Sequence, residues 1–185
     1  MPFIVGSFVI LFLYLCSASV VTYALFPLQI FIFGEIDSQA SFFYLPHGVR
    51  VLSVILMGWR ALPALLLAHL VTGYYLNEIP NDQLIFLLSS SSVLSVYLAY
   101  HCCFRHAELY GLRFNQIILK NILVLSVAAS LLNAVSNILI YQIFNTNMNY
   151  NIDHVTSYFI GDVVGAMIIY ILISQFRKLF ALKPL

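Results

Sequence analysis

The sequence predicts an all-α integral membrane protein, a bundle of about six transmembrane helices with both termini in the cytoplasm. Two observations on composition carry the fold class. Of the 185 residues, 62% are hydrophobic, with a mean hydropathy of +0.97, and only 8% are charged. Soluble domains carry about 25% charged residues, so the composition excludes a soluble globular protein. Spans of about 20 residues would use most of the chain, so residues 1–185 are expected to form a single membrane domain.

The third observation is the order of the charged residues, which lie mainly in short gaps between apolar runs. The first, third and fifth gaps carry acidic residues and no Lys or Arg: Glu35 and Asp37, then Glu78 and Asp82, then Asp153. The second and fourth gaps and the C-terminal segment carry the basic residues: Arg60, then Arg105, Arg113 and Lys120 with Glu108, then Arg177, Lys178 and Lys183. Because cytoplasmic loops are enriched in Lys and Arg, this alternation predicts that the basic gaps are cytoplasmic and the acidic gaps external.

The first predicted span lies within residues 3–33, which contain no Lys or Arg. A cleaved signal peptide needs a basic segment before its apolar core, so this span is expected to be retained. Pro27 is expected to kink the helix or to end it, because proline lacks the backbone N–H that the helix needs.

The second and third predicted spans, residues 42–59 and 61–76, are short and flank Arg60. Pro46 fits the first turn of a helix, where its missing N–H costs nothing. A re-entrant hairpin that enters from outside is the alternative, but it would place Arg60 near mid-membrane at a cost of about 2.5–3.5 kcal/mol. A cytoplasmic turn beside Trp59 avoids that cost, so the sequence favours two spans.

The last three predicted spans cover residues 84–100, 121–144 and 156–174. Small residues recur in the fourth and fifth spans: Ser89, Ser90, Ser91, Ser92 and Ser95, then Ser126, Ser130 and Ala134. Small residues at helical spacing let helices approach closely in lipid. Helix packing is therefore the interpretation of both sets.

Two charged residues, Arg50 and Asp162, lie outside the gaps. Arg50 lies about eight residues into the second span and Asp162 about six into the sixth, so their depths are roughly 12 Å and 9 Å at 1.5 Å per residue. Opposite charges at similar depth predict a buried ion pair. His47 lies one turn above Arg50 and is expected to face the same way.

Other polar residues are predicted in the same outer layer: His69 in the third span, Asn133 and Asn137 in the fifth, and Gln29 near the outer end of the first. Polar groups at membrane depth are costly unless they face the bundle and find partners. Their convergence predicts either a ligand pocket that opens to the outside or a purely structural polar core. The candidate binding residues are His47, Arg50, His69, Asn133, Asn137 and Asp162.

The sequence indicates neither a metal site nor a cofactor. A group of potential ligands at the inner end of the fourth span matches no zinc-binding spacing: His101, Cys102, Cys103 and His106. No nucleophile lies beside a base at a suitable spacing, which favours a protein that is not an enzyme. The alternative is a catalytic set of His47, His69 and Asp162. A net charge of +1 argues against nucleic acid as a partner.

Three short motifs follow one another along the chain. They are an aromatic–Pro–x–Gly stretch in residues 42–49, a Gly–Arg–Pro turn in residues 58–63, and an aromatic–x–Gly–Asp–x–x–Gly stretch in residues 158–165. In this order, the motifs resemble those of the bacterial membrane-associated sensor domain of the first type. Carried over by position, the family-type residues are Pro46, Gly48, Gly161, Asp162 and Gly165.

The resemblance implies a multi-span sensory module of bacterial inner membranes, of the kind that usually precedes a histidine kinase or a cyclic-di-GMP enzyme. The chain departs from the family's pattern in three ways. The family usually has more spans than are predicted here, Arg50 stands where the family is usually apolar, and only eight residues follow Arg177. Any signal is therefore expected to pass through another chain.

Three functions remain open from the sequence. The first is a stand-alone sensory or binding module that takes a small-molecule ligand from the outer side and acts through a partner membrane protein. The second is a substrate-capture subunit similar to those of energy-coupling-factor vitamin importers, with a separate ATPase because this sequence has no phosphate-binding loop. The third is a non-catalytic accessory subunit whose contacts are membrane lipid and a larger membrane complex.

Overall fold

The computed structural model describes residues 3–34, 41–76, 81–109, 119–144 and 152–179. Within these ranges the chain is helical and contains no strand. Five helical runs are long and apolar enough to cross a membrane: Phe3–Phe33, Leu45–Tyr75, Asp82–Phe104, Lys120–Ile143 and Thr156–Phe176. An all-helical architecture compatible with a multi-pass membrane protein is therefore present, as the composition predicts.

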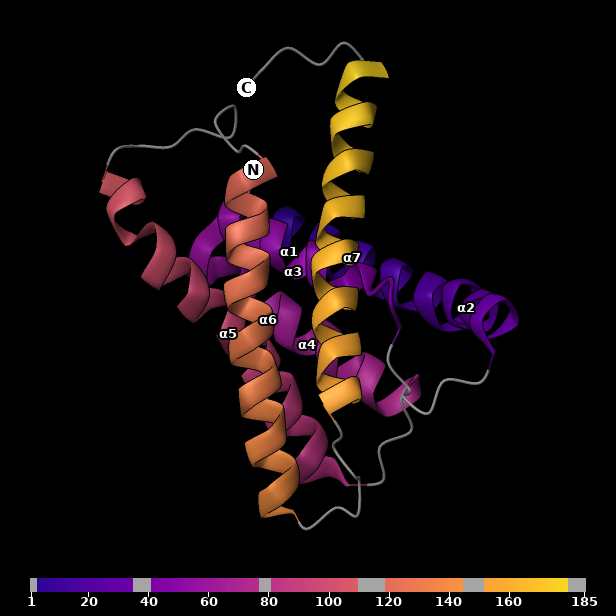
Figure 1. Ribbon diagram of the computed structural model, residues 1–185. Helices are drawn as coiled ribbons and strands as arrows, with labels where there is room; N and C mark the ends of the chain where they lie inside the picture. Colours follow the sequence, from indigo (N-terminus) through magenta and orange to yellow (C-terminus); the bar gives the residue numbers. More distant parts are fainter. Residues whose placement is uncertain (1–2, 35–40, 77–80, 110–118, 145–151, 180–185) are drawn as a thin grey trace.

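The first run is one continuous helical path of three parts: α1 (Phe3–Val20), the π-helical turn η1 (Val21–Leu25) and α2 (Phe26–Phe33). The π-helical hydrogen bond runs from the N–H of Phe26 to the carbonyl of Val21, immediately before Pro27. Because Pro27 has no N–H to donate, a wider turn at this point interrupts the regular α-helical ladder without ending the helix. The run stops at Gly34, where φ is +81°. In Figure 1 it passes behind α7 at a large angle, and α2 extends beyond the other helices.

The second run contains α3 (Leu45–Met57), the 3-10 turn η2 (Gly58–Ala61) and α4 (Leu62–Tyr75). Two contacts with α5 show that the chain folds back at η2. Arg50 of α3 contacts Ser92, and His69 of α4 contacts Ser89, which lies within one turn of Ser92. In a straight helix, 19 residues would separate Arg50 and His69 by about 28 Å. A fold-back at this place agrees with the predicted turn. Each arm is only about 20 Å long, which is shorter than the hydrocarbon core of about 30 Å.

The remaining helices are α5 (Asp82–Leu109), α6 (Leu119–Ile143) and α7 (Ile152–Leu179). α6 packs against both α5 and α7, while α4 packs against α1 and α5; Figure 1 shows α6 and α7 side by side. α3 is the central element, because it packs against α1, α5, α6 and α7. Every residue from 45 to 54 is buried.

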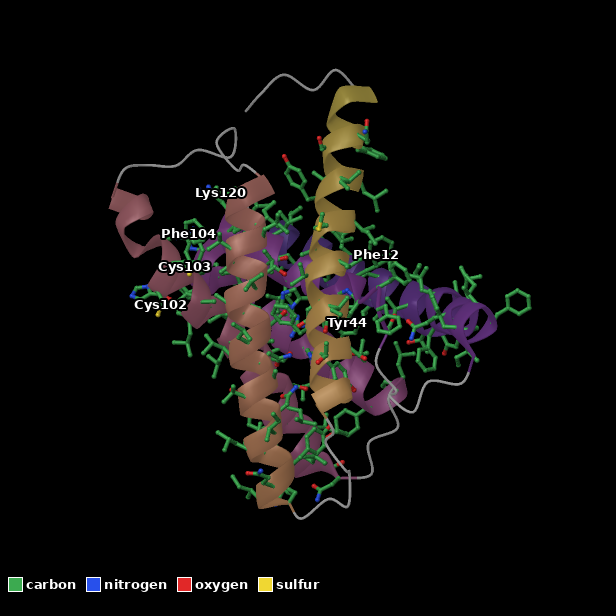
Figure 2. All side chains as sticks on the ribbon, viewed as in Figure 1. Phe12, Tyr44, Cys102, Cys103, Phe104 and Lys120 are labelled. Atoms are coloured by element: carbon green, nitrogen blue, oxygen red, sulfur yellow. The ribbon has the colours of Figure 1, made fainter. Side chains whose placement is uncertain are left out.

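Large apolar side chains cover much of the outside of the molecule, as Figure 2 shows. Phe12 on α1 and Phe31 on α2 are 67% and 88% exposed. An apolar exterior around buried polar residues is the arrangement that lipid favours, since polar groups in hydrocarbon must find partners inside the protein.

Candidate functional site

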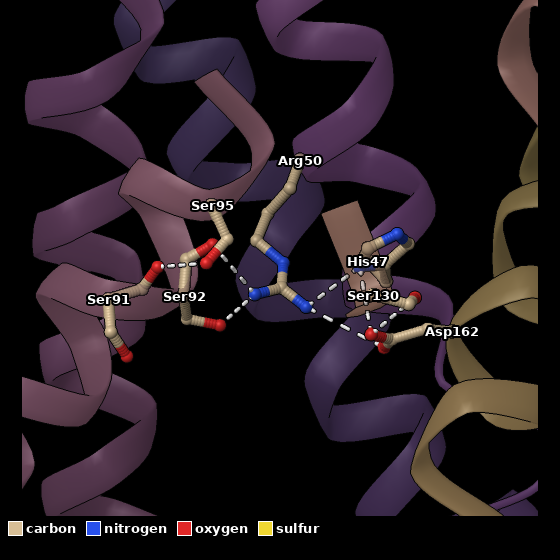
Figure 3. A network of polar contacts seen from close by, with 7 residues as sticks. All are labelled: His47, Arg50, Ser91, Ser92, Ser95, Ser130 and Asp162. Atoms are coloured by element: carbon tan, nitrogen blue, oxygen red, sulfur yellow. Dashed lines mark hydrogen bonds and ion pairs between the residues drawn. The ribbon is translucent and has the colours of Figure 1, made fainter. Parts of the chain in front are cut away.

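The two polar residues of α3, His47 and Arg50, lie one turn apart and face the same way, as the sequence predicts. α3 starts with Pro46 in its first turn, where a proline ring fits the helix and no N–H is needed. The side chain of His47 is fully buried, that of Arg50 is 1% exposed and that of Asp162 is 6% exposed. Figure 3 shows these three residues meeting in the interior between α3, α5, α6 and α7. We call His47, Arg50 and Asp162 the charged cluster.

Arg50 connects α5 to α7. Its Nη2 lies 3.7 Å from Oδ1 of Asp162, which confirms the predicted contact, and 3.0 Å from Nδ1 of His47. Its Nη1 donates to Ser92 on the other side, through both the carbonyl oxygen at 3.3 Å and the hydroxyl. The guanidinium carbon also lies 5.7 Å from the centre of the Tyr44 ring, within the range of a cation–π interaction.

Asp162 has two further contacts, one with α6 and one with α3. Its Oδ2 accepts a hydrogen bond of 2.9 Å from the hydroxyl of Ser130 on α6 and lies 3.2 Å from Nδ1 of His47 on α3. A buried charge is strongly destabilising when its partner is removed. The carboxylate therefore ties α7 to both α3 and α6.

Glycines set how closely α7 approaches the start of α3. A Cβ atom at Gly161 would overlap the backbone oxygen of Ser41, and one at Gly48 would lie 2.8 Å from the oxygen of Gly165. The N–H of Tyr44 donates a hydrogen bond of 3.0 Å to the carbonyl of Gly161. The residues of the first and third sequence motifs thus meet where α3 crosses α7, and this close contact brings Asp162 to Arg50.

His69 belongs to a neighbouring polar group. Its Nδ1 lies 3.3 Å from the hydroxyl of Ser89, and its ring centre lies 5.9 Å from that of Tyr14 on α1. Tyr14 is fully buried, and its hydroxyl has no hydrogen bond of regular geometry. The contact of Tyr14 with His69 therefore joins α1 to α4.

The two predicted asparagines lie along the seam between α5 and α6. Oδ1 of Asn137 accepts a hydrogen bond of 3.2 Å from Ser91, whereas Oδ1 of Asn133 is buried without a hydrogen-bond partner. Near the other end of the first run, Oε1 of Gln29 accepts a 2.7 Å hydrogen bond from the N–H of Phe42. The structure therefore brings three of the six candidate residues into one cluster and distributes the other three around it.

Sequence reasoning did not assign Ser92 and Ser130 as partners of the charged pair. Both belong to the serine sets that were interpreted as helix packing, and that interpretation is incomplete because each also contacts a charged side chain. The roles of Tyr14 and Tyr44 were missed as well. A periodic serine indicates that a helix face is buried, but it does not indicate which side chain it will meet.

The C-terminal part of α5 presents Cys102 and Cys103 at the surface, as Figure 2 shows. His101 is also exposed, while the side chain of His106 lies outside the described part. Among the side chains that the structure does describe, no group of three His, Cys, Asp or Glu residues is placed to hold a metal ion.

Comparisons with known protein families, curated proteins and solved structures find no match for this chain. The resemblance to the sensor domain therefore stays a prediction from three sequence motifs.

Proposed function

We propose that this chain is a sensory or binding module of the bacterial inner membrane that passes its state to a partner protein. The observation that carries the proposal is the charged cluster, in which a buried Arg50, His47 and Asp162 join side chains from α3, α5, α6 and α7. A change at any one of these contacts acts on four helices at once. Ionisable residues inside a membrane domain mark functional sites more often than structural ones.

The way in which a signal would leave the site follows from the same contacts. Asp162 and the two motif glycines belong to α7, whose other end carries the basic residues Arg177 and Lys178. A rearrangement of the Arg50–Asp162 contact would move α7 against α3, because the close crossing at Gly161 and Gly165 leaves no space for gradual adjustment. A helix that shifts as a rigid element can carry that movement to a partner.

The proposal includes six spans with both termini in the cytoplasm, with α3 and α4 as two short spans. This orientation places the charged cluster in the outer half of the membrane, so a ligand would reach it from the outer side. The charge alternation along the sequence supports the orientation, and the fold-back at η2 supports the separation of the second run into two arms.

Complementation of a deletion strain tests this function, alongside recovery of the partner from native membranes. His69→Gln and Asn137→Ser keep a polar side chain of similar or smaller size, so they should abolish complementation while the protein still accumulates and still co-purifies with its partner. Leu139→Ala is a matched control, because Leu139 lies on the exposed face of α6. Normal complementation by both polar variants would contradict the proposal.

A second candidate is a non-catalytic accessory subunit, and one observation favours it. Arg50 and Asp162 compensate each other inside the bundle, as a purely structural ion pair would. In that case a bulky substitution on an exposed helix face, such as Val135→Trp on α6, should release the partner, while His69→Gln and Asn137→Ser should be silent. Ser130 cannot serve for this test, because it is buried inside the bundle and contacts Asp162.

A further inference from the structure

Nδ1 of His47 lies beside two groups that favour opposite protonation states of this nitrogen. Nδ1 lies 3.0 Å from Nη2 of Arg50, which can only donate, and 3.2 Å from Oδ2 of Asp162, which only accepts when it is ionised. If Nδ1 carries a proton, it suits Asp162 but meets the hydrogens of Arg50. If Nδ1 is unprotonated, it suits Arg50 but meets the lone pairs of an ionised Asp162.

The position of Arg50 indicates which protonation state Nδ1 of His47 has. Nη2 lies closer to Nδ1 of His47, at 3.0 Å, than to Oδ1 of Asp162, at 3.7 Å. Paired guanidinium and carboxylate groups usually form two parallel hydrogen bonds of about 2.7–2.9 Å, but here Nη1 is directed to Ser92 instead. The arrangement fits an unprotonated Nδ1 that accepts from Arg50 and a proton on Oδ2 of Asp162.

We infer that His47 and Asp162 form a proton-binding site in which one proton lies between Oδ2 of Asp162 and Nδ1 of His47. Uptake adds one proton to the carboxylate, breaks no covalent bond and changes the summed charge of Arg50 and Asp162 from zero to +1. Release restores the carboxylate, and Arg50 then turns from His47 toward Asp162. The ligand of the site is the proton itself.

The groups around the site fit this role. The other titratable groups that act on the cluster are Tyr14 from α1, Tyr44 before α3, His69 from α4 and Tyr158 from α7. Among the described residues, the cluster contacts of α5 and α6 are uncharged: the hydroxyl and carbonyl groups of Ser92 and the hydroxyl of Ser130. The other ring nitrogen of His47, Nε2, is buried without a hydrogen-bond partner. Tyrosine and serine hydroxyls are uncharged near neutral pH. They can both donate and accept hydrogen bonds, so they can adjust to either position of the proton without adding a charge.

The proton would be the stimulus that the proposed sensory module detects, so this inference rests on the proposed function. The two can fail separately, because proton binding is measured on the purified chain without a partner, whereas the sensory function is measured by complementation.

Infrared spectroscopy of the full chain in lipid nanodiscs tests the site, because a protonated carboxyl group has a carbonyl band that an ionised carboxylate lacks. Exposed carboxyl groups also show this band at low pH, but they are ionised well above their usual pKa values of about 3.9–4.3. The wild type should keep a residual carboxyl band above that range and lose it only at higher pH. Asp162→Asn should lose the residual band, and Asp82→Asn should keep it, because Asp82 is exposed at the start of α5. His47→Gln should shift the midpoint of the titration, because the proton would lose its second partner.

Isotope labelling keeps the test independent of whether Asp162→Asn folds. In wild-type protein made with aspartate that carries ¹³C in its side-chain carboxyl group, the residual band should shift to lower frequency, which assigns it to an aspartate and not to a glutamate. A residual band that does not shift, one that persists in folded Asp162→Asn, or a midpoint that His47→Gln leaves unchanged would overturn the proposal. So would the absence of a residual band in the wild type above the range in which exposed carboxyl groups titrate.

Discussion

Gly165 of α7 lies directly against the backbone of Tyr44, so closely that a Cβ atom at residue 165 would overlap the carbonyl oxygen of Tyr44. Unlike the end of a flexible side chain, a backbone oxygen at this place cannot move aside without shifting the start of α3. Asp162 lies within one turn of this contact on α7, and His47 and Arg50 lie within two turns of it on α3, so the spacing of the helices and the geometry of the cluster are coupled.

The first prediction concerns that contact. Gly165→Ala should lower the free energy of unfolding by about 1–3 kcal/mol, the usual effect of overpacking, when unfolding is followed in detergent. Gly6→Ala is the matched control, because a Cβ atom there meets only the end of the Met57 side chain. Equal stability of the two variants would show that α7 does not approach Tyr44 this closely.

The second prediction tests the ion pair with a double-mutant cycle. At a pH at which Asp162 is ionised, Arg50→Ala and Asp162→Ala should each lower stability by about 3–5 kcal/mol, because each leaves an uncompensated buried charge. The double variant should recover part of this loss. Combining Arg50→Ala with Asp82→Ala provides the control and should give additive effects, since Asp82 is exposed at the start of α5. Additive effects for Arg50 and Asp162 would mean that the two do not interact.

The third prediction compares two buried serines on the same face of α6. Ser130 donates to Asp162, whereas the hydroxyl of Ser126 is buried without a hydrogen-bond partner. Ser130→Ala should therefore cost about 1–3 kcal/mol in thermal or chemical unfolding, the range for leaving a buried acceptor unsatisfied. Ser126→Ala should be neutral or stabilising. The reverse order of the two effects would contradict the assignment of Ser130 as a partner of Asp162.

The fourth prediction concerns orientation. In a background with Cys16, Cys102 and Cys103 replaced by serine, single cysteines at residues 36, 80 and 150 should react with an impermeant maleimide in intact cells. A cysteine at residue 180 should react only after the cells are lysed. All four positions lie outside the described residues, and the charge alternation alone motivates the expected result. Labelling at residue 180 in intact cells would reverse the proposed orientation.

The contact between Arg50 and Asp162 could be predicted because a helix converts sequence position into depth. Counting residues from the outer end of each predicted span placed the two at a similar level, and opposite charges at one level have a strong reason to meet. The partners Ser92 and Ser130 could not be predicted in the same way. Depth alone does not say how a helix is rotated about its axis, and rotation depends on packing with every neighbouring helix.

The ends of the helices were also less predictable than their existence. α5 and α7 run to Leu109 and Leu179, beyond the predicted spans of residues 84–100 and 156–174. Hydropathy marks where an apolar run ends, whereas backbone hydrogen bonding continues into the polar segment that follows. The π-helical turn before Pro27 was missed, because the sequence shows that a donor is absent without showing how the helix compensates.

The burial of α3 has a consequence for the order in which the protein is made. Arg50 is synthesised before Asp162, which follows it by 112 residues and belongs to α7. Until α7 emerges from the ribosome, the hydrogen bonds that the described residues offer the guanidinium come from Ser92 and His47, neither of which supplies a negative charge. Docking of α7 therefore brings the carboxylate that compensates Arg50, and a chain truncated before α7 should be recognised by the cell's quality control as unassembled.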